Sequence, residues 1–273
     1  MKIIGVGDCV LDEYVTQERL YPGGNSVNVP VLAKRAGADS AAYIGILGSD
    51  ESSKQFSSFL RDEQIDVSRV RYVDGIMARN YISLDEQGDR SFVGNNGSEV
   101  AQKMFWLQLN EKDLEVIKRY DVLHTSYHSE IDEIIPKVLG KVAISLDFSD
   151  AYTESAIRRY CSGLDFVFLS AGSFDEAYTV SCANLALEVG ANVVVLTHGL
   201  DGSTIFTKSG IHHEDAVKIS ALDALGAGDA YIASFLEAFY SSDGNIQSAA
   251  KRASEFAAQN CLHHGATGVF FTV

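Results

Sequence analysis

The chain has 273 residues, 46% of them hydrophobic, so it can bury a sizeable core as one large domain or two small ones. Its formal net charge of −15 at pH 7 excludes a general affinity for nucleic acid or for anionic membranes, because both are polyanions. The sequence has no long apolar stretch, and its cysteines have no CxxC spacing. We therefore expect a cytoplasmic protein with reduced thiols and neither a membrane partner nor a zinc site; the cysteines are Cys9, Cys161, Cys182 and Cys261.

Short β-rich runs recur along the chain, namely KIIGV, AAYIG, DVLHT, VAISLD, FVFLS and VVVLT. Helical patterns such as 51–63 and 174–190 lie between most of them. Because these runs are apolar on both faces, they predict a mostly parallel α/β sheet covered by helices on both faces. Residues 227–240 and 247–262 predict two further helices near the C-terminus.

Residues 77–97, MARNYISLDEQGDRSFVGNNG, break this rhythm. They predict two strands around a polar turn that contains Gly88, with no helix between them. The pattern fits an ordinary edge hairpin and a small β flap equally well. Long insertions into compact domains often serve as lids, which gives the flap functional weight.

The segment GVGDCV follows the first predicted strand and suggests a dinucleotide-binding turn. That fingerprint requires a third glycine where this chain has Val10, so a dehydrogenase is disfavoured. Asp8 and Asp12 remain as polar groups after the strand, where ligand crevices of α/β sheets lie. The alternative is a pair of loop carboxylates in solvent.

The segment YPGGNSVN holds two glycines, Gly23 and Gly24, that would let the backbone approach a ligand closely. Asn25 and Asn28 supply amides that both donate and accept, which suits a neutral polyol. The structural alternative is a helix start capped by Asn25 or Ser26.

The segment DALGAGDA opens the predicted helix 227–240. Gly226, Ala227 and Gly228 can leave backbone N–H groups free to stabilise a transferring phosphoryl group. Asp229 can then accept a proton from the hydroxyl that attacks phosphorus. Alternatively, Asp229 is only a first-turn acid that favours the helix dipole.

Two other groups of residues predict structure rather than function. His124 and His128 have i, i+4 spacing but no third metal ligand nearby, so a hydrogen-bonded structural histidine is favoured at His124. Trp106, between Phe105 and Leu107, predicts core packing, because no basic surface accompanies it.

The motifs GGNSVN, YIGILGSD, LTHGLDGSTIF and DALGAGD, in this order, resemble those of the ribokinase-like sugar kinases, also called the phosphofructokinase-B family. The resemblance extends over nearly the whole chain. It implies a Rossmann-like α/β domain with a small β lid. The implied boundaries are 1–11, 23–72 and 99–273 for the core, and 12–22 and 73–98 for the lid.

The resemblance also implies transfer of the ATP γ-phosphoryl group to a primary sugar hydroxyl, with Mg²⁺ bridging the phosphates. Asp229 would be the base, and Gly226, Ala227 and Gly228 the anion hole. The sugar contacts would be Asp8, Asp12, Gly23, Gly24 and Asn28. The nucleotide contacts would be Thr197, Gly199, Gly202 and Asn260.

The chain departs from the family pattern in two places. Ala224 stands where the family usually has threonine. Ser170 replaces the asparagine of an Asn-x-x-Glu motif that helps to hold Mg²⁺ through water, so Asp175 or Glu176 would have to serve. Relatives often bind a monovalent cation beside the segment with Gly226, Ala227 and Gly228, which we call the anion loop. A K⁺ requirement is left open here.

Within the family, GDCVLDEY, YPGGNSVNV, LDFSD and HHGA most resemble fructoselysine 6-kinases, which form fructoselysine 6-phosphate. The acids Asp8, Asp12 and Glu99 would suit the amine of such a substrate. A plain ketose, ribose or a nucleoside stays open as substrate, as does a catalytically silent sugar-binding sensor. Many relatives dimerise through the lid, and we expect a homodimer of that kind.

Overall fold

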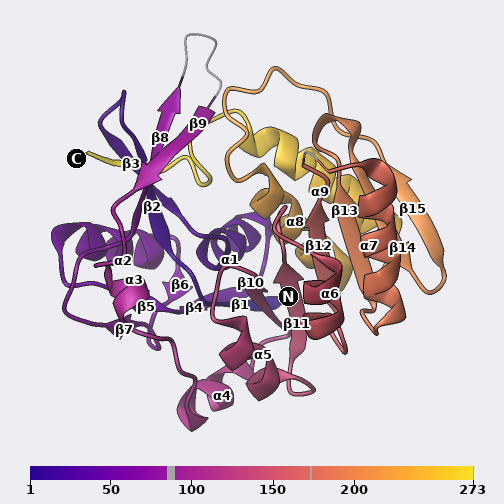
Figure 1. The fold of residues 1–273 in the computed structure, drawn as a ribbon, viewed down its shortest axis with the longest axis horizontal. Coiled ribbons are helices and arrows are strands. Elements are labelled where there is room, and N and C mark those ends of the chain that lie inside the picture. The colour runs from indigo at the N-terminus through magenta and orange to yellow at the C-terminus, as the bar shows by residue number, and fades with distance from the viewer. Residues whose placement is uncertain (85–89, 173, 273) are drawn as a thin grey trace.

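The computed structural model of the protein describes residues 1–84, 90–172 and 174–272. Within them, nine strands form a central sheet in the order β15-β14-β13-β12-β11-β10-β1-β4-β6, in which all neighbours pair in parallel except β13–β14 and β14–β15 (Figure 1). The strands are β1 (Lys2–Val6), β4 (Ser40–Ile44), β6 (Ile65–Asp66), β10 (Val122–Ser126), β11 (Ala143–Asp147), β12 (Phe166–Ser170), β13 (Val193–Thr197), β14 (Ser203–Thr207) and β15 (Gly210–Glu214).

Helices cover both faces of this sheet. Successive residues of a strand point to opposite faces, so each strand contributes side chains to a core on either side. Ile3 packs into one apolar core and Ile4 into the other. The first core includes α1 (Asn25–Ala36), α2 (Glu51–Asp62), α8 (Ala227–Ser241) and α9 (Ile246–Asn260). The second includes α4 (Glu111–Ile117), α5 (Ile131–Val138), α6 (Glu154–Tyr160) and α7 (Glu176–Glu188). The predicted α/β class and the four helices predicted by range are confirmed.

A second sheet stands beside the first, at the upper left of Figure 1, in the order β16-β3-β2-β8-β9. Its strands are β2 (Val10–Tyr14), β3 (Arg19–Gly23), β8 (Arg79–Leu84), β9 (Arg90–Asn95) and β16 (Phe271–Thr272). The antiparallel pair β8–β9 confirms the predicted hairpin, whose turn with Gly88 lies outside the described residues. β16 falls in the range that we assigned to the α/β core, yet it pairs with β3. The other domain boundaries remain a prediction.

Four short elements complete the described part of the chain. They are β5 (Ile46–Leu47), β7 (Arg71–Tyr72), α3 (Ala101–Met104) and the 3₁₀ turn η1 (Gly199–Asp201). All four cysteines are buried, and no disulfide joins them. No helix in the described part of the chain is long and apolar enough to cross a membrane.

The prediction that Trp106 packs in the core is wrong. Its side chain is 72% exposed, whereas that of Leu107 is 2% exposed. The segment between α3 and α4 starts with extended backbone at Phe105, and neighbouring side chains of an extended segment point to opposite sides. Only one side chain of the pair can therefore reach the core.

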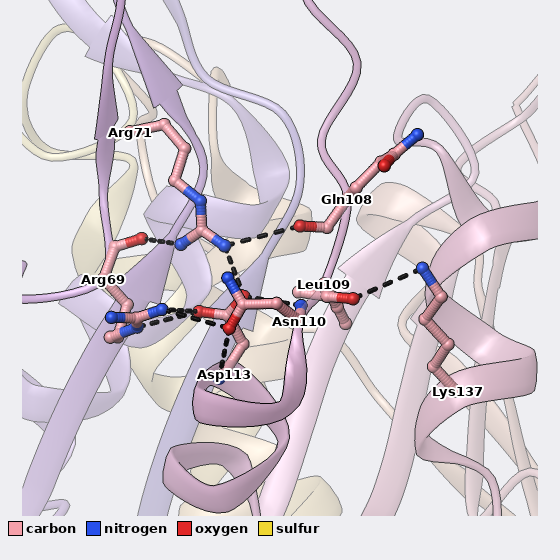
Figure 2. Close-up of polar contacts among 7 residues, drawn as sticks. All are labelled: Arg69, Arg71, Gln108, Leu109, Asn110, Asp113 and Lys137. Carbon is pink, nitrogen blue, oxygen red and sulfur yellow. Dashed lines mark hydrogen bonds and ion pairs between the residues drawn. The ribbon is translucent and has the colours of Figure 1, made fainter.

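A buried carboxylate fixes α4 against the segment that leads to the lid (Figure 2). Asp113 is fully buried and accepts hydrogen bonds from Arg69 Nε, at 2.8 Å, and from Arg71. It also completes a capping box with Asn110. Burial raises the pKa of Asp113, but the hydrogen bonds from Arg71, the Asn110 backbone and Arg69 outweigh this and hold that pKa below its ordinary value.

Asp113→Asn should lower the free energy of unfolding by about 3 kcal/mol, because it leaves two partly buried guanidinium groups without their counter-charge. Asp132→Asn is the matched control, since its ion pair with Arg159 is more than half exposed on both sides and should contribute less than about 1 kcal/mol. Urea unfolding at pH 7 measures both. Equal effects of the two substitutions would contradict this account.

Candidate active site

The carboxyl ends of β1, β10 and β11 meet the N-terminal ends of α1 and α8. Gly5 makes this meeting possible, because a Cβ atom there would lie 1.9 Å from the carbonyl oxygen of Ser26. A glycine in β1 therefore lets the first turn of α1 lie directly on the strand. The side chains of that turn, Asn25 and Asn28, reach Asp229 in α8.

Asp229 is held by one amide on each carboxylate oxygen. Its Oδ1 accepts from Asn25 Nδ2 at 2.6 Å, and its Oδ2 accepts from Asn28 Nδ2 at 2.7 Å. Burial raises the pKa of Asp229, although these two hydrogen bonds oppose the rise. Each oxygen keeps a second lone pair. The carboxylate is thus fixed in place, more basic than usual, and able to accept a further proton.

Asn25 links Asp229 to a second carboxylate. Its Nδ2 also donates to Asp147 Oδ2 at 3.0 Å, and its Oδ1 faces His124 Nε2 at 2.7 Å. Burial lowers the pKa of His124 to about 3, so the ring is neutral. Its Nε2 then carries the proton, because Asn25 Oδ1 can only accept, and its Nδ1 accepts from Ser145 Oγ at 2.9 Å. His124 is the hydrogen-bonded structural histidine that the sequence favoured.

Asp147 ends β11 and is buried beside Asp229. Its Oδ1 accepts from the Ser149 backbone N–H at 2.9 Å, and its Oδ2 accepts from Ser149 Oγ at 3.0 Å. Burial raises the pKa of Asp147 to about 7, and repulsion from Asp229 and Asp8 adds to the rise against the hydrogen bonds from Ser149. No ion pair joins Asp147 to a lysine or arginine among the described residues.

The start of α8 offers backbone donors to an anion. Gly226 is the N-cap, with φ 77° and ψ 5°, and no side chain caps the helix. Within the described residues, the N–H groups of Gly226 and Gly228 have no partner, whereas that of Ala227 is 3.2 Å from the carbonyl oxygen of Ala224. Two of the three N–H groups expected in the anion hole are therefore free, and the third takes part in a turn.

Asp223 ties this loop to the lid. Its carboxylate accepts from Tyr14 Oη in β2 at 2.5 Å, from Leu225 N at 2.8 Å and from Gly265 N at 2.9 Å. Tyr14 is fully buried. A movement of β2 would consequently shift the anion loop through the hydrogen bond from Tyr14 to Asp223.

A cavity of about 510 Å³ opens from the start of α8 toward α9. Its volume is in the range of small-molecule and cofactor sites. Asp147, Asp229 and the glycines of the anion loop lie at its polar end, and apolar side chains form much of the rest. The predicted nucleotide residues Thr197, Gly199 and Gly202 line it.

Asn260, expected as a nucleotide contact, does not line this cavity. It is 5% exposed, and its Nδ2 donates to the carbonyl oxygen of Ala266 at 3.0 Å. Ala266 in turn packs closely against Gly226, because a Cβ atom on Gly226 would lie only 2.5 Å from Ala266 Cα. The amide of Asn260 therefore supports the anion loop from behind.

On the sugar side, Asn28 is the clearest candidate contact. It is 4% exposed, and its Oδ1 has no partner among the described residues. Its Nδ2 is fixed on Asp229, so the buried Oδ1 is the acceptor that this side chain keeps unused. Gly24, the N-cap of α1, and Gly23, which pairs with Val10, bring the backbone close to this point.

Three acids are expected beside the amine of the substrate. Two of them already accept hydrogen bonds from the protein, and the third is exposed. Asp8 Oδ1 accepts three hydroxyl groups, each at 2.8 Å, and Oδ2 accepts from Asn25 N at 3.0 Å; the hydroxyls belong to Ser26, Ser126 and Ser129. Asp12 is buried in the lid sheet and accepts from Asn80 Nδ2 at 3.0 Å. Glu99 is exposed. Asp8 therefore holds Asn25 and Ser26 in place, and Asp12 connects two strands of the lid sheet.

The residues expected near a metal lie at the start of α7. Asp175 caps that helix by accepting from Ala177 N at 3.0 Å, whereas Glu176 is exposed and lines an adjoining cavity of about 690 Å³. Ser170 and Gly199 border both cavities. The described residues contain no cluster of three or more metal-ligating side chains. A cation at this place would therefore have to take most of its ligands from phosphates and water.

The chain is similar in sequence to known carbohydrate kinases. The model of the "pfkB family carbohydrate kinase" matches residues 6–270. The chain is 39% identical over 268 residues to fructosamine kinase FrlD of Bacillus subtilis (strain 168), covering 98% of this chain and 93% of that protein. It is 27% identical to the fructoselysine 6-kinase of Escherichia coli (strain K12), covering 96% and 97% of the two chains.

Solved structures share the fold. Aminoimidazole riboside kinase from Salmonella enterica, complexed with aminoimidazole riboside and an ATP analog, superposes with a TM-score of 0.77 at 18% identity, over 98% of this chain and 94% of the other. A ribokinase II described as putative, from E. coli, in complex with ATP and Mg²⁺, gives a TM-score of 0.81 at 16% identity, over 97% and 94%. The ribokinase-like fold is thereby confirmed.

The raised pKa of Asp147 predicts a pH-dependent stability. Its folded value, about 7, exceeds the ordinary 3.8, so between these values the folded protein binds more protons than the unfolded chain. The stability that this group contributes is complete below pH 3.8 and is lost as pH rises to about 7. The unfolding free energy of the wild type minus that of Asp147→Asn should therefore fall from pH 5 to pH 8, as measured by urea unfolding. A difference that stays constant would contradict the raised pKa.

Proposed function

Because the chain belongs to the pfkB family of carbohydrate kinases, we propose that it transfers the γ-phosphoryl group of ATP to the primary hydroxyl of a sugar–amine adduct. Fructoselysine, converted to fructoselysine 6-phosphate, is the substrate that we expect first. The observation that carries the reaction is the half-buried Asp229, held by two amides beside the free N–H groups of Gly226 and Gly228. The substrate class is supported by the 39% identity to a fructosamine kinase.

In the proposed reaction, Asp229 accepts the proton of the primary hydroxyl as its oxygen attacks the γ-phosphorus. The bond from that phosphorus to the β–γ bridging oxygen breaks, and ADP leaves with the electron pair. Gly226 and Gly228 donate to the phosphoryl oxygens, where charge is held during transfer. Asn28 Oδ1 accepts from a second sugar hydroxyl and so orients the acceptor.

Mg²⁺ would neutralise charge on the β- and γ-phosphates, with Glu176 holding it through water. The side chains fit this arrangement, because the cavity near the anion loop has carboxylates but no lysine or arginine in its described lining. Ser170 and Ala224 lack the groups that relatives carry at these positions. We leave a K⁺ requirement open, and the activity assay described below tests it.

The second candidate is a sugar-binding sensor of the same fold without turnover. The geometry of Asp229 favours an enzyme, because a pure binding protein gains nothing from a carboxylate of raised pKa beside free N–H donors. A plain ketose, ribose or nucleoside is the alternative substrate.

Asp229→Asn should lower kcat by ~10²–10⁴, because the carboxamide cannot accept the proton of the hydroxyl. Sugar and ATP should still bind, as measured by calorimetry. Glu255→Gln removes the same charge from an exposed position of α9 and serves as the control. Near-normal turnover of Asp229→Asn would rule out the assigned base.

The substrate class is tested by ADP release with Mg-ATP across fructoselysine, other fructosamines, fructose, ribose and adenosine, each with and without K⁺. We expect the highest kcat/KM for a fructosamine. A preference for fructose, ribose or adenosine would replace the proposed substrate, and binding without ADP release would favour the sensor.

We also propose a homodimer through the lid. β9 exposes two apolar side chains, Phe92 at 61% and Val93 at 57%, on a sheet edge without a neighbouring strand among the described residues. Light scattering at micromolar concentration should give twice the mass of one chain. The mass of a single chain would exclude this dimer.

A further inference from the structure

One buried carboxylate near the reacting groups has no role in the reaction as proposed. Asp147 faces the same cavity as Asp229, from β11 rather than α8. The Nδ2 atom of Asn25 lies between them, 3.0 Å from Asp147 Oδ2 and 2.6 Å from Asp229 Oδ1. One carboxamide therefore joins two carboxylates with its two hydrogens.

The orientation of this carboxamide is fixed from its other side. His124 Nε2 lies 2.7 Å from Asn25 Oδ1, and Ser145 fixes the imidazole tautomer by donating to Nδ1. A flipped amide would point its oxygen at two carboxylates and its NH₂ group at an N–H donor. Both Nδ2 hydrogens of Asn25 are thus used and its Oδ1 already accepts from His124, so the side chain connects the residues around it.

We propose that Asp147 is a positioning residue for phosphoryl transfer: it holds one Nδ2 hydrogen of Asn25, which directs the other at Asp229, and its protonation weakens this connection. The inference rests on the proposed role of Asp229 as the base. It assigns to Asn25 and Asp147 a part in placing that base, although neither touches the reacting atoms in this scheme.

The groups that face Asp147 place its titration within the range of an activity assay. Asp229 faces it from α8, and Asp8 from the connection between β1 and β2, and both raise its pKa. His124 of β10 stays neutral down to about pH 3 and adds no charge there. Burial is the largest cause of the rise, and the resulting pKa is about 7. Below this value Asp147 gains a proton, the charge-assisted hydrogen bond to Asn25 is lost, and the rate should fall.

The test is the pH dependence of kcat from pH 5.5 to 9 for the wild type, Asp147→Asn, and the control Asp150→Asn, whose carboxylate is exposed. The wild type and the control should lose activity below about pH 7. Asp147→Asn should lower kcat at pH 8 by about 10-fold to 100-fold, as expected for a displaced catalytic group. Its acidic limb should move at least one pH unit lower, because the site cannot titrate and no longer repels the charge on Asp229. The KM of the sugar should not change.

Asn25→Ala gives a second test that does not require Asp147→Asn to fold. It should lower kcat in the same way, and the double variant should be no slower than Asn25→Ala alone, because both changes break one connection. An unchanged acidic limb in Asp147→Asn, strictly additive losses, or a rise confined to the KM of ATP would overturn the proposal. Turnover retained by Asp229→Asn would instead overturn the proposed base, so the two failures are distinguishable.

Discussion

The contact between Gly5 of β1 and the first turn of α1 is the constraint on which the site depends. Any side chain at Gly5 would overlap the carbonyl oxygen of Ser26, 1.9 Å from the Cβ position, and push the helix away from the strand. Asn25 and Asn28 would move with it, and Asp229 would lose both of its amide partners. The arrangement of Asn25 and Asn28 around Asp229 is therefore a consequence of how closely α1 lies on β1.

The electrostatics of the site follow from this packing. Repulsion from Asp229 and Asp8 adds to the raised pKa of Asp147, repulsion from Asp8 adds to that of Asp229, and no described lysine or arginine pairs with these carboxylates. Their hydrogen bonds come instead from serine hydroxyls, asparagine amides and backbone N–H groups. Uncharged donors keep the carboxylates buried without neutralising them, which preserves their basicity at a cost in stability. Backbone N–H groups at the start of α8 likewise let a phosphate approach without a lysine.

Much of this arrangement could be predicted from the sequence, because hydrophobic period and glycine placement fix the elements and their order. Asp229, Asn28 and the anion loop carry a local signal in GGNSVN and DALGAGD. The role of Asn25 has no such local signal. It depends on His124, which is 99 residues away in the sequence, and on Asp229, which is 204 residues away. Asp147 in LDFSD carries the same local signal as Asp8, a carboxylate at the end of a buried strand. Trp106 was misjudged because hydrophobicity alone does not say which side of an extended segment faces the core.

The central claim is that Asp229 takes the proton from a primary sugar hydroxyl that attacks the γ-phosphorus. A crystal structure with a fructosamine and a non-hydrolysable Mg-ATP analogue would test it most directly. The account predicts the primary hydroxyl oxygen at about 2.6–3.2 Å from an Asp229 carboxylate oxygen, in line with the γ-phosphorus, with Gly226 and Gly228 N–H groups directed at the phosphate. A sugar that presents its hydroxyl to another group, or a γ-phosphate bound away from the start of α8, would contradict it.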